Sequence, residues 1–196
     1  MGFRNIPQTT TILTDIIQDD TRAGEVVRRI RTLVKKETPR REAVELNNAV
    51  WETIGLVRSA SFLEGLSIMA ELDPDLPVVQ GDRVQLQQVV LNLLLNATAA
   101  MRDTPPASRQ LVIRTAMEDG RAVRFSVRDS GTGIDRNDVD RLFEPFYTTK
   151  ADGLGMGLSI SRMIISAHGG TIWAENNPGG GATFSFTLPM DRDGQP

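Results

Sequence analysis

Three side-chain amides share one expected helix face in the most apolar stretch of the chain. Gln88, Asn92 and Asn96 lie four residues apart within residues 82–101, and the residues around Asn92 are apolar. Side chains four apart lie on the same face of a helix. Asparagine is a poor helix former, so its repeated use there needs a reason. The amide oxygens could bind a ligand or a metal ion, or the amides could be core groups bonded to a neighbouring strand. The spacing alone leaves both open.

Glycine-rich segments follow this stretch. Residues 129–133 (Asp-Ser-Gly-Thr-Gly) put a carboxylate at the end of an expected strand, before glycines that let the backbone approach a flat ligand. Residues 153–159 run directly into an expected helix, whose free N–H groups suit phosphates. Leu158 stands where a dinucleotide-binding fingerprint would have its last glycine, and no P-loop lysine is present, so neither fold is expected. Each segment taken alone is also typical of a glycine turn.

Together these elements resemble the ATP-binding catalytic domain of bacterial sensor histidine kinases of the FixL-like, PAS-linked type, within the gyrase–Hsp90–histidine kinase superfamily. Residues 92–97 resemble its asparagine box and residues 142–146 its phenylalanine box. Its three glycine boxes are matched by residues 129–133, 153–157 and 181–183. The resemblance covers about residues 41–189. Residues 19–31 also resemble the second helix of the dimerisation domain in these kinases.

The resemblance implies that the cofactors are ATP and Mg²⁺. Asn96 would bind Mg²⁺ through its amide oxygen, which suits a hard ion that completes its shell with phosphate and water. Asp129 would accept a hydrogen bond from the exocyclic amine of adenine, and Thr183 would lie at the same edge of the ring.

The resemblance also implies how the phosphates are held. Lys150 would be a mobile cationic contact, and Phe143 and Phe146 would anchor the segment that carries it. An alternative is that the two phenylalanine side chains only pack a short loop and have no role that responds to nucleotide. The remaining nucleotide-binding positions would be Gly131, Gly133, Gly153, Gly155, Gly157 and Leu158.

Asn92 decides which chemistry the resemblance implies. The water-using ATPases of the superfamily carry a glutamate one helical turn before the Mg²⁺ asparagine, and an amide cannot act as a general base. Phosphoryl transfer depends mainly on positioning and charge stabilisation. We therefore expect Asn92 and Lys150 to belong to a site that presents ATP to a nucleophile from elsewhere, which in this family is a histidine on the first dimerisation helix.

The chain holds a single histidine, His168, at an expected helix end before Gly169. A structural or helix-dipole role is expected for it, so the chain should not phosphorylate itself. The implied partners are a histidine-bearing dimerisation helix, in cis or in trans, and the receiver domain of a response regulator. A homodimer is left open. The alternatives are an ATPase or serine kinase of the same superfamily, and a dimerising module that only binds nucleotide.

The surrounding pattern predicts an α+β fold: an α/β sandwich with a largely antiparallel mixed sheet covered by helices on one face, preceded by one long amphipathic helix over residues 8–36. The resemblance implies a Bergerat-type ATP-binding fold. Strands are predicted over residues 43–46, 66–72, 78–79, 111–117, 122–129, 171–174 and 182–188. Helices are predicted from an Asn47 cap to about residue 62, from an Asp82 cap to about residue 101, and over residues 157–167.

The predicted domains are a partial dimerisation hairpin over residues 1–38, the catalytic domain over residues 41–190, and a flexible tail over residues 191–196. Trp51 and Trp173 are expected in the core. With 22 Lys and Arg against 25 Asp and Glu, the net charge is −3. The basic run in residues 28–41 is therefore expected to be a solvated helix face that binds no nucleic acid.

Composition excludes several other classes. No cysteine is present, which removes disulfides and thiol catalysis, and one histidine cannot form a multi-histidine metal centre. No run approaches the roughly 18 apolar residues of a membrane span, so we expect no membrane contact in this segment. The lack of cysteine suits a cytoplasmic location, and a full-length parent could be soluble or membrane-anchored.

Overall fold

The computed structural model describes residues 41–58, 65–150 and 153–190. The chain divides into two units, Met1–Thr38 and Pro39–Pro196, and every described residue belongs to the second. The helix predicted over residues 8–36 and the tail predicted over residues 191–196 lie outside the described residues. Within the described part, no helix is long and apolar enough to cross a membrane.

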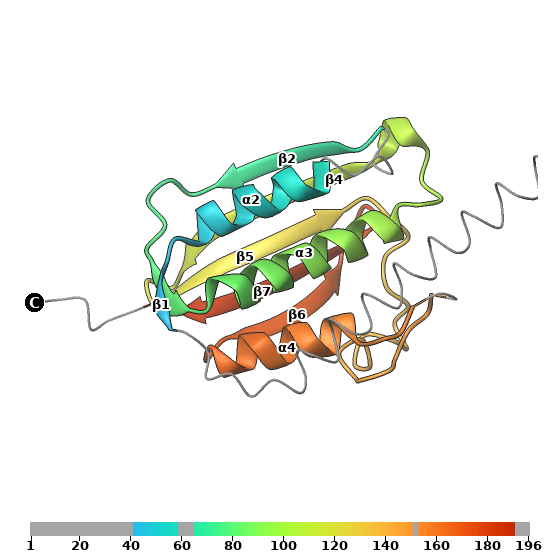
Figure 1. Ribbon diagram of the computed structural model, residues 1–196. Coiled ribbons are helices and arrows are strands. Elements are labelled where there is room, and N and C mark those ends of the chain that lie inside the picture. Colours follow the sequence, from blue (N-terminus) through green and yellow to red (C-terminus); the bar gives the residue numbers. More distant parts are fainter. Residues whose placement is uncertain (1–40, 59–64, 151–152, 191–196) are drawn as a thin grey trace, which may run out of the picture. The chain divides into compact units, whose positions relative to one another are not determined.

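A mixed sheet of five strands forms one layer of this unit (Figure 1). Its strands, in the order β2-β4-β5-β7-β6, are Ser67–Leu72, Gln110–Glu118, Ala122–Asp129, Ala182–Pro189 and Thr171–Asn176. Only the pair β2–β4 is parallel, which confirms the prediction of a largely antiparallel sheet. Residues 119–121 join β4 to β5, and Asp119 and Gly120 have positive φ angles of 50° and 61°, as the Asp-Gly pair predicts for a hairpin.

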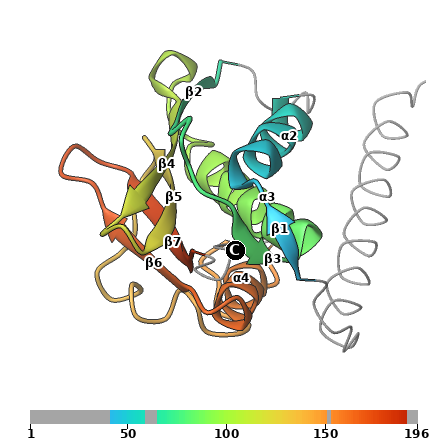
Figure 2. The ribbon, with the colours of Figure 1, turned by 90° about the vertical axis from the view of Figure 1, so that its left-hand side faces the viewer.

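In the described part of the chain, three α-helices cover one face of the sheet (Figure 2). They are α2 (Leu46–Arg58), α3 (Arg83–Ala100) and α4 (Gly157–Ala167), and α3 packs between the other two and over β5. As predicted, Asp82 caps α3, because its side chain accepts a hydrogen bond from the Gln85 N–H at 3.1 Å. The core lies between the layers, where the rings of Phe125 and Phe186 stack with centroids 5.0 Å apart. The predicted α+β sandwich is confirmed.

Two short strands close one end of the helical layer. β1 (Glu42–Val44) pairs antiparallel with β3 (Val79–Gly81), which directly precedes α3. A single turn of 3-10 helix, η2 (Pro106–Ser108), leads from α3 into β4. The two strands confirm the extended segments predicted near residues 43–46 and 78–79.

The start of α2 differs from the prediction. Its first turn forms on the Glu45 carbonyl, which accepts the N–H groups of Asn48 and Ala49 at 3.1 and 3.3 Å, so the predicted Asn47 cap is wrong. The Asn47 amide instead donates to the Asp73 carbonyl and accepts the Thr115 hydroxyl, at 2.7 and 2.8 Å. It therefore ties α2 to the sheet.

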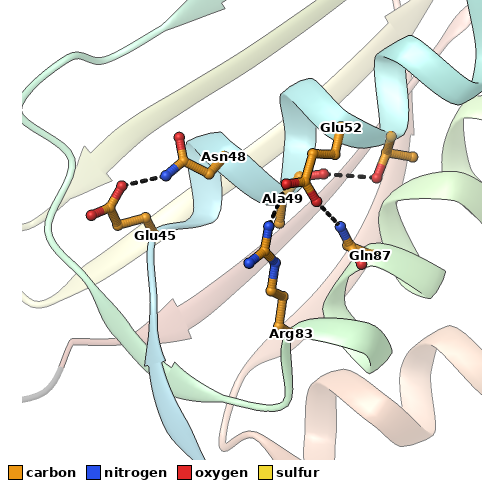
Figure 3. A network of polar contacts seen from close by, with 7 residues as sticks. Glu45, Asn48, Ala49, Glu52, Arg83 and Gln87 are labelled. Carbon is orange, nitrogen blue, oxygen red and sulfur yellow. Dashed lines mark hydrogen bonds and ion pairs between the residues drawn. The ribbon is translucent and has the colours of Figure 1, made fainter.

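Glu52 joins the exposed sides of α2 and α3 (Figure 3). Its carboxylate pairs with Arg83 and accepts a hydrogen bond from Gln87 at 2.6 Å. Trp51 precedes Glu52 on this helix and is 50% exposed, so its predicted place in the core is wrong. Val50 and Ile54 fill the buried stripe, and the next residue along a helix is rotated by about 100°. Trp173 is half-buried on the other face of the sheet, with the Arg124 guanidinium over its ring.

His168 has the structural role predicted for it. Its buried ring ends α4, with Nδ1 at 2.7 Å from the Ile164 carbonyl. Nε2 accepts the Asp82 N–H at 2.9 Å. Because a carbonyl can only accept and an N–H can only donate, these contacts select the neutral tautomer protonated at Nδ1. One ring thus joins the end of α4 to the start of α3.

Candidate functional site

Two asparagines of α3 contact α4 and the segment before it. Asn92 Nδ2 donates to the Ser161 hydroxyl at 3.0 Å, and that hydroxyl lies 3.1 Å from the Gly157 carbonyl in the first turn of α4. A Cβ on Gly157 would collide with the Asn92 amide. Position 157 therefore needs glycine, because the side chain of Asn92 takes the space. The amide bonds to a helix rather than to a strand.

Asn96 lies one turn further along α3 and contacts a cation. Its Oδ1 accepts a hydrogen bond from the Lys150 ammonium at 3.1 Å. Desolvation lowers the pKa of Lys150 below its ordinary value, and the nearby Arg102 charge adds to this. Within the described residues, no cluster of three or more carboxylates and histidines could hold a metal ion alone. A metal at Asn96 would therefore need further ligands of another kind, such as water or the oxygens of a bound molecule.

Asp129 ends β5 with a carboxylate that is only 2% exposed. Its Oδ1 accepts the N–H groups of Gly131 and Ala182, at 2.8 and 3.2 Å. Its Oδ2 is buried and has no partner among the described residues. Burial raises the pKa of this carboxyl, and the two backbone hydrogen bonds oppose the shift. Buried polar atoms are almost always hydrogen-bonded, so Oδ2 is suited to a donor brought by a ligand.

Glycines allow the backbone to close around this carboxylate. A Cβ on Gly131 would lie within 3 Å of the Ala100 carbonyl carbon at the end of α3. Gly181 has a φ of +76°, and a Cβ there would collide with the Asp129 carbonyl. The first and last glycine segments thus meet at Asp129, although they are about 50 residues apart in the sequence.

Thr183 does not lie beside the Asp129 carboxylate. It stands opposite Arg128 in the β5–β7 ladder, whereas Ala182 is the residue that contacts the carboxylate. Its hydroxyl donates to Asn177 Oδ1 at 2.7 Å. Neighbouring residues of a strand point to opposite faces, so the structure does not bring Thr183 to the expected position. Ala182, on the correct face, carries no hydroxyl.

The segment between the glycine loops carries the remaining predicted residues. Phe143 packs against the core, but Phe146 is 76% exposed and has a φ of +66°, so the expectation that both rings anchor the segment is wrong for Phe146. Gly155 has a φ of +65°, and its α-carbon faces the Phe146 carbonyl too closely for any Cβ. Of the other predicted positions, Gly153 lies beside the Thr148 hydroxyl. Leu158 packs against the core.

Sequence reasoning missed several residues of this site. Ser161 contacts Asn92, and Ala182 contacts Asp129. Asn176, the last residue of β6, contacts the loop after Asp129, and Asn177, the next residue, contacts the Asp129 carbonyl. Ser161 follows Gly157 by four residues, which could have indicated a shared helix face. The two asparagines precede a Pro-Gly turn and carry no signal beyond that.

The family described as "Histidine kinase-, DNA gyrase B-, and HSP90-like ATPase" matches residues 81–192. The chain belongs to this family. It contains the nucleotide-binding ATPase domain that sensor histidine kinases carry, which confirms the resemblance predicted from its motifs.

Curated relatives support the same conclusion. The chain is 38% identical over 185 residues to the sensor protein FixL of Bradyrhizobium diazoefficiens, covering 94% of the chain and 36% of FixL. It is 36% identical over 187 residues to the sensor histidine kinase TmoS of Ectopseudomonas mendocina, covering 95% of the chain and 19% of TmoS. The chain thus spans about a third or less of these relatives.

Solved structures share the fold. The nucleotide-free catalytic domain of the histidine kinase ThkA is 34% identical, with a TM-score of 0.64 over 76% of this chain and 95% of that one. ThkA in complex with the response regulator protein TrrA has a TM-score of 0.73 at 27% identity, over 96% of this chain and 52% of that one.

Proposed function

We propose that the chain is the ATP-binding phosphodonor module of a two-component sensor histidine kinase. It would transfer the γ-phosphoryl group of ATP to a histidine on a dimerisation helix outside this chain, for relay to a response regulator. The observation that carries the proposal is Asn92, an amide held by Ser161 at the position where a water-activating carboxylate would be needed.

The residues around Asp129 fit an adenine base. The buried Oδ2 without a partner can accept one hydrogen of the exocyclic amine, while Oδ1 stays bonded to the Gly131 and Ala182 N–H groups. A carbonyl in place of that amine would face a carboxylate oxygen, which is repulsive. Asp129 would therefore select adenine over guanine.

The residues around Asn96 fit a Mg²⁺-phosphate group. Asn96 Oδ1 accepts a hydrogen bond from the Lys150 ammonium, so its lone pairs point to a position that a cation already occupies. Asn96 would bind the ion, and Lys150, released from Asn96, would contact the phosphates as a point charge. A bound Mg²⁺ would neutralise phosphate charge during transfer.

The transfer itself needs positioning rather than a base. The incoming imidazole nitrogen would form the new bond to the γ-phosphorus as the bond to the β–γ bridging oxygen breaks, and ADP would leave. Asn92 offers no group that could activate water, so hydrolysis would compete poorly. Residues 1–38 would supply the second helix of the dimerisation hairpin and residues 41–190 the catalytic domain, in a cytoplasmic part of the parent kinase. The ThkA–TrrA complex supports a response regulator as the downstream partner.

The test supplies what this chain lacks. A histidine-bearing dimerisation domain, mixed with the chain, Mg²⁺ and γ-labelled ATP, should acquire an acid-labile label, and Asn96→Ala should abolish the labelling. Asn48→Ala is the matched control, because Asn48 is an exposed asparagine on α2 that bonds to Glu45. Acid-stable labelling of serine, or steady phosphate release without the added domain, would refute the proposal.

A further inference from the structure

The last residue of β6 holds a loop by both atoms of its side-chain amide. Asn176 Oδ1 accepts the Ile134 N–H at 2.7 Å, and Asn176 Nδ2 donates to the Ile134 carbonyl at 2.7 Å. A backbone N–H can only donate and a carbonyl can only accept, so the amide has a single orientation that satisfies both. We call this pair of hydrogen bonds the Asn176 clamp.

The clamp joins the sheet to the loop through a side chain rather than through a strand pair. β6 is an edge strand whose strand partner is β7. In an antiparallel ladder, a hydrogen-bonded residue pair exchanges both its N–H and its carbonyl bonds. The single side-chain amide of Asn176 satisfies both the N–H and the carbonyl of Ile134 in a comparable way.

The clamped residue stands at a junction in the site. Ile134 directly follows the Gly131–Gly133 loop next to Asp129, and it begins the segment that carries Phe143 and Lys150. The Ile134 side chain packs against the core, so its backbone is held from two sides. Gly133 has a φ of +76°, and a Cβ there would lie 2.8 Å from Asn176 Oδ1. Glycine at 133 is therefore needed for the clamp to close.

The next residue holds the other side of the same carboxylate-bearing turn. Asn177 Nδ2 donates to the Asp129 carbonyl at 3.3 Å, while its Oδ1 accepts the Thr183 hydroxyl. Asn176 and Asn177 thus contact the backbone at both ends of residues 129–134. A loop held at both ends is preorganised for its ligand, which lowers the entropic cost of binding.

We propose that Asn176 is a positioning residue for nucleotide binding. Its clamp on Ile134 sets the path of the Gly131–Gly133 loop beside Asp129. The same clamp fixes the first residue of the segment that carries Lys150. This proposal rests on the proposed function, because a positioning role for Asn176 requires that nucleotide binds at Asp129. Because the loop lies at the base-binding end, both ADP and ATP should be affected.

The first test measures ADP affinity by calorimetry with the full chain. Asn176→Ala should weaken ADP binding about five- to tenfold, as expected from losing two modest hydrogen bonds that preorganise the loop. It should also speed amide hydrogen exchange at Ile134. Asn137→Ala, an exposed asparagine three residues after Ile134, should change neither. Unchanged ADP affinity in a folded Asn176→Ala protein would overturn the proposal.

The second test uses a pH profile that a purely structural role would not produce. In Asn176→Asp, an ionised carboxylate still accepts the Ile134 N–H but repels the Ile134 carbonyl, whereas a protonated carboxyl restores both bonds. The ratio of its ADP dissociation constant to that of the wild type should therefore fall as the pH is lowered from 7 to about 4, near the ordinary aspartate pKa of about 3.9, and the corresponding ratio for Asn176→Ala should stay constant. A ratio independent of pH would overturn the clamp.

The controls separate the two proposals. If the wild type fails to bind ADP, the proposed function fails. If the wild type binds and Asn176→Ala binds equally well, only the clamp fails. Loss of the cooperative unfolding transition in both Asn176 variants would make Asn176 a residue of the fold, which also overturns its role in positioning.

Discussion

Asp129→Asn separates the two consequences of the buried carboxylate at the end of β5. The substitution keeps the shape of the side chain, and the remaining amide oxygen can still accept the N–H groups of Gly131 and Ala182. The amide nitrogen then replaces Oδ2, the buried oxygen without a partner. An acceptor suited to the adenine amine thus becomes a donor that faces it.

The expected loss follows from the charged hydrogen bond. A hydrogen bond to an ionised group contributes about 1.5–3 kcal/mol, so ADP and ATP should bind roughly 10- to 150-fold more weakly. The same change favours a carbonyl at that position of the base. The preference for ATP over GTP should therefore shrink or reverse, which a general loss of packing would not produce.

Stability should move in the opposite direction. Burial raises the pKa of the Asp129 carboxyl above its unfolded value, so the ionised carboxylate opposes folding at neutral pH. The contribution of this group to stability is present below the unfolded pKa and is lost as the pH rises through the folded pKa. Asp129→Asn should therefore equal or exceed the wild type in stability at pH 7–8, and this advantage should shrink as the pH falls below the raised pKa.

Calorimetric titration with ADP, ATP and GTP, together with urea unfolding between pH 4 and 8, measures both effects. Gly55→Ala on the exposed side of α2 is a suitable control, because a Cβ there would meet nothing within 4 Å. Unchanged ADP binding would refute the assignment of Oδ2 to the base. A marked loss of stability at pH 8 would refute the argument that burial penalises the charge.

Two further predictions concern α3 and its neighbours. Lys150→Ala should weaken binding of a non-hydrolysable ATP analogue with Mg²⁺ more than binding of ADP, because Lys150 is proposed to contact the outer phosphate. Equal losses of affinity for the two ligands in parallel calorimetric titrations would contradict this. Gly157→Ala should lower the free energy of unfolding in urea by about 1–3 kcal/mol, because the added Cβ collides with the Asn92 amide. Adding Asn92→Ala to the same chain should recover part of this stability. If the losses of the two substitutions simply add in the double variant, the collision is excluded.

Much of the fold follows from local patterns in the sequence. The alternation in β5, the Asp82 cap and the Asp-Gly hairpin each depend on a few adjacent residues, and the structure confirms all three. Trp51 shows where such patterns fail. A large apolar side chain suggests burial, but the side of a helix that is buried depends on its rotation against the sheet, and one residue changes that rotation by about 100°.

The candidate site was predictable where spacing along one element decides the geometry. Asn92 and Asn96 share a helix face, and Asp129 begins a glycine loop, so each position could be found in the sequence. Thr183 shows the limit, because a shift of one residue in a strand moves a side chain to the other face. Asn176 could not be found, since its partner Ile134 is 42 residues away and the contact depends on how the sheet edge meets the loop.

The buried ring of His168 has a practical consequence for any phosphorylation assay. Both of its nitrogens are engaged, one with the Ile164 carbonyl and the other with the Asp82 N–H, and the chain has no second histidine. A phosphoryl group on either nitrogen would have to break the junction between α3 and α4. The folded chain should therefore contribute no phosphohistidine of its own. Phosphohistidine labelling in a mixture can be assigned to the added acceptor.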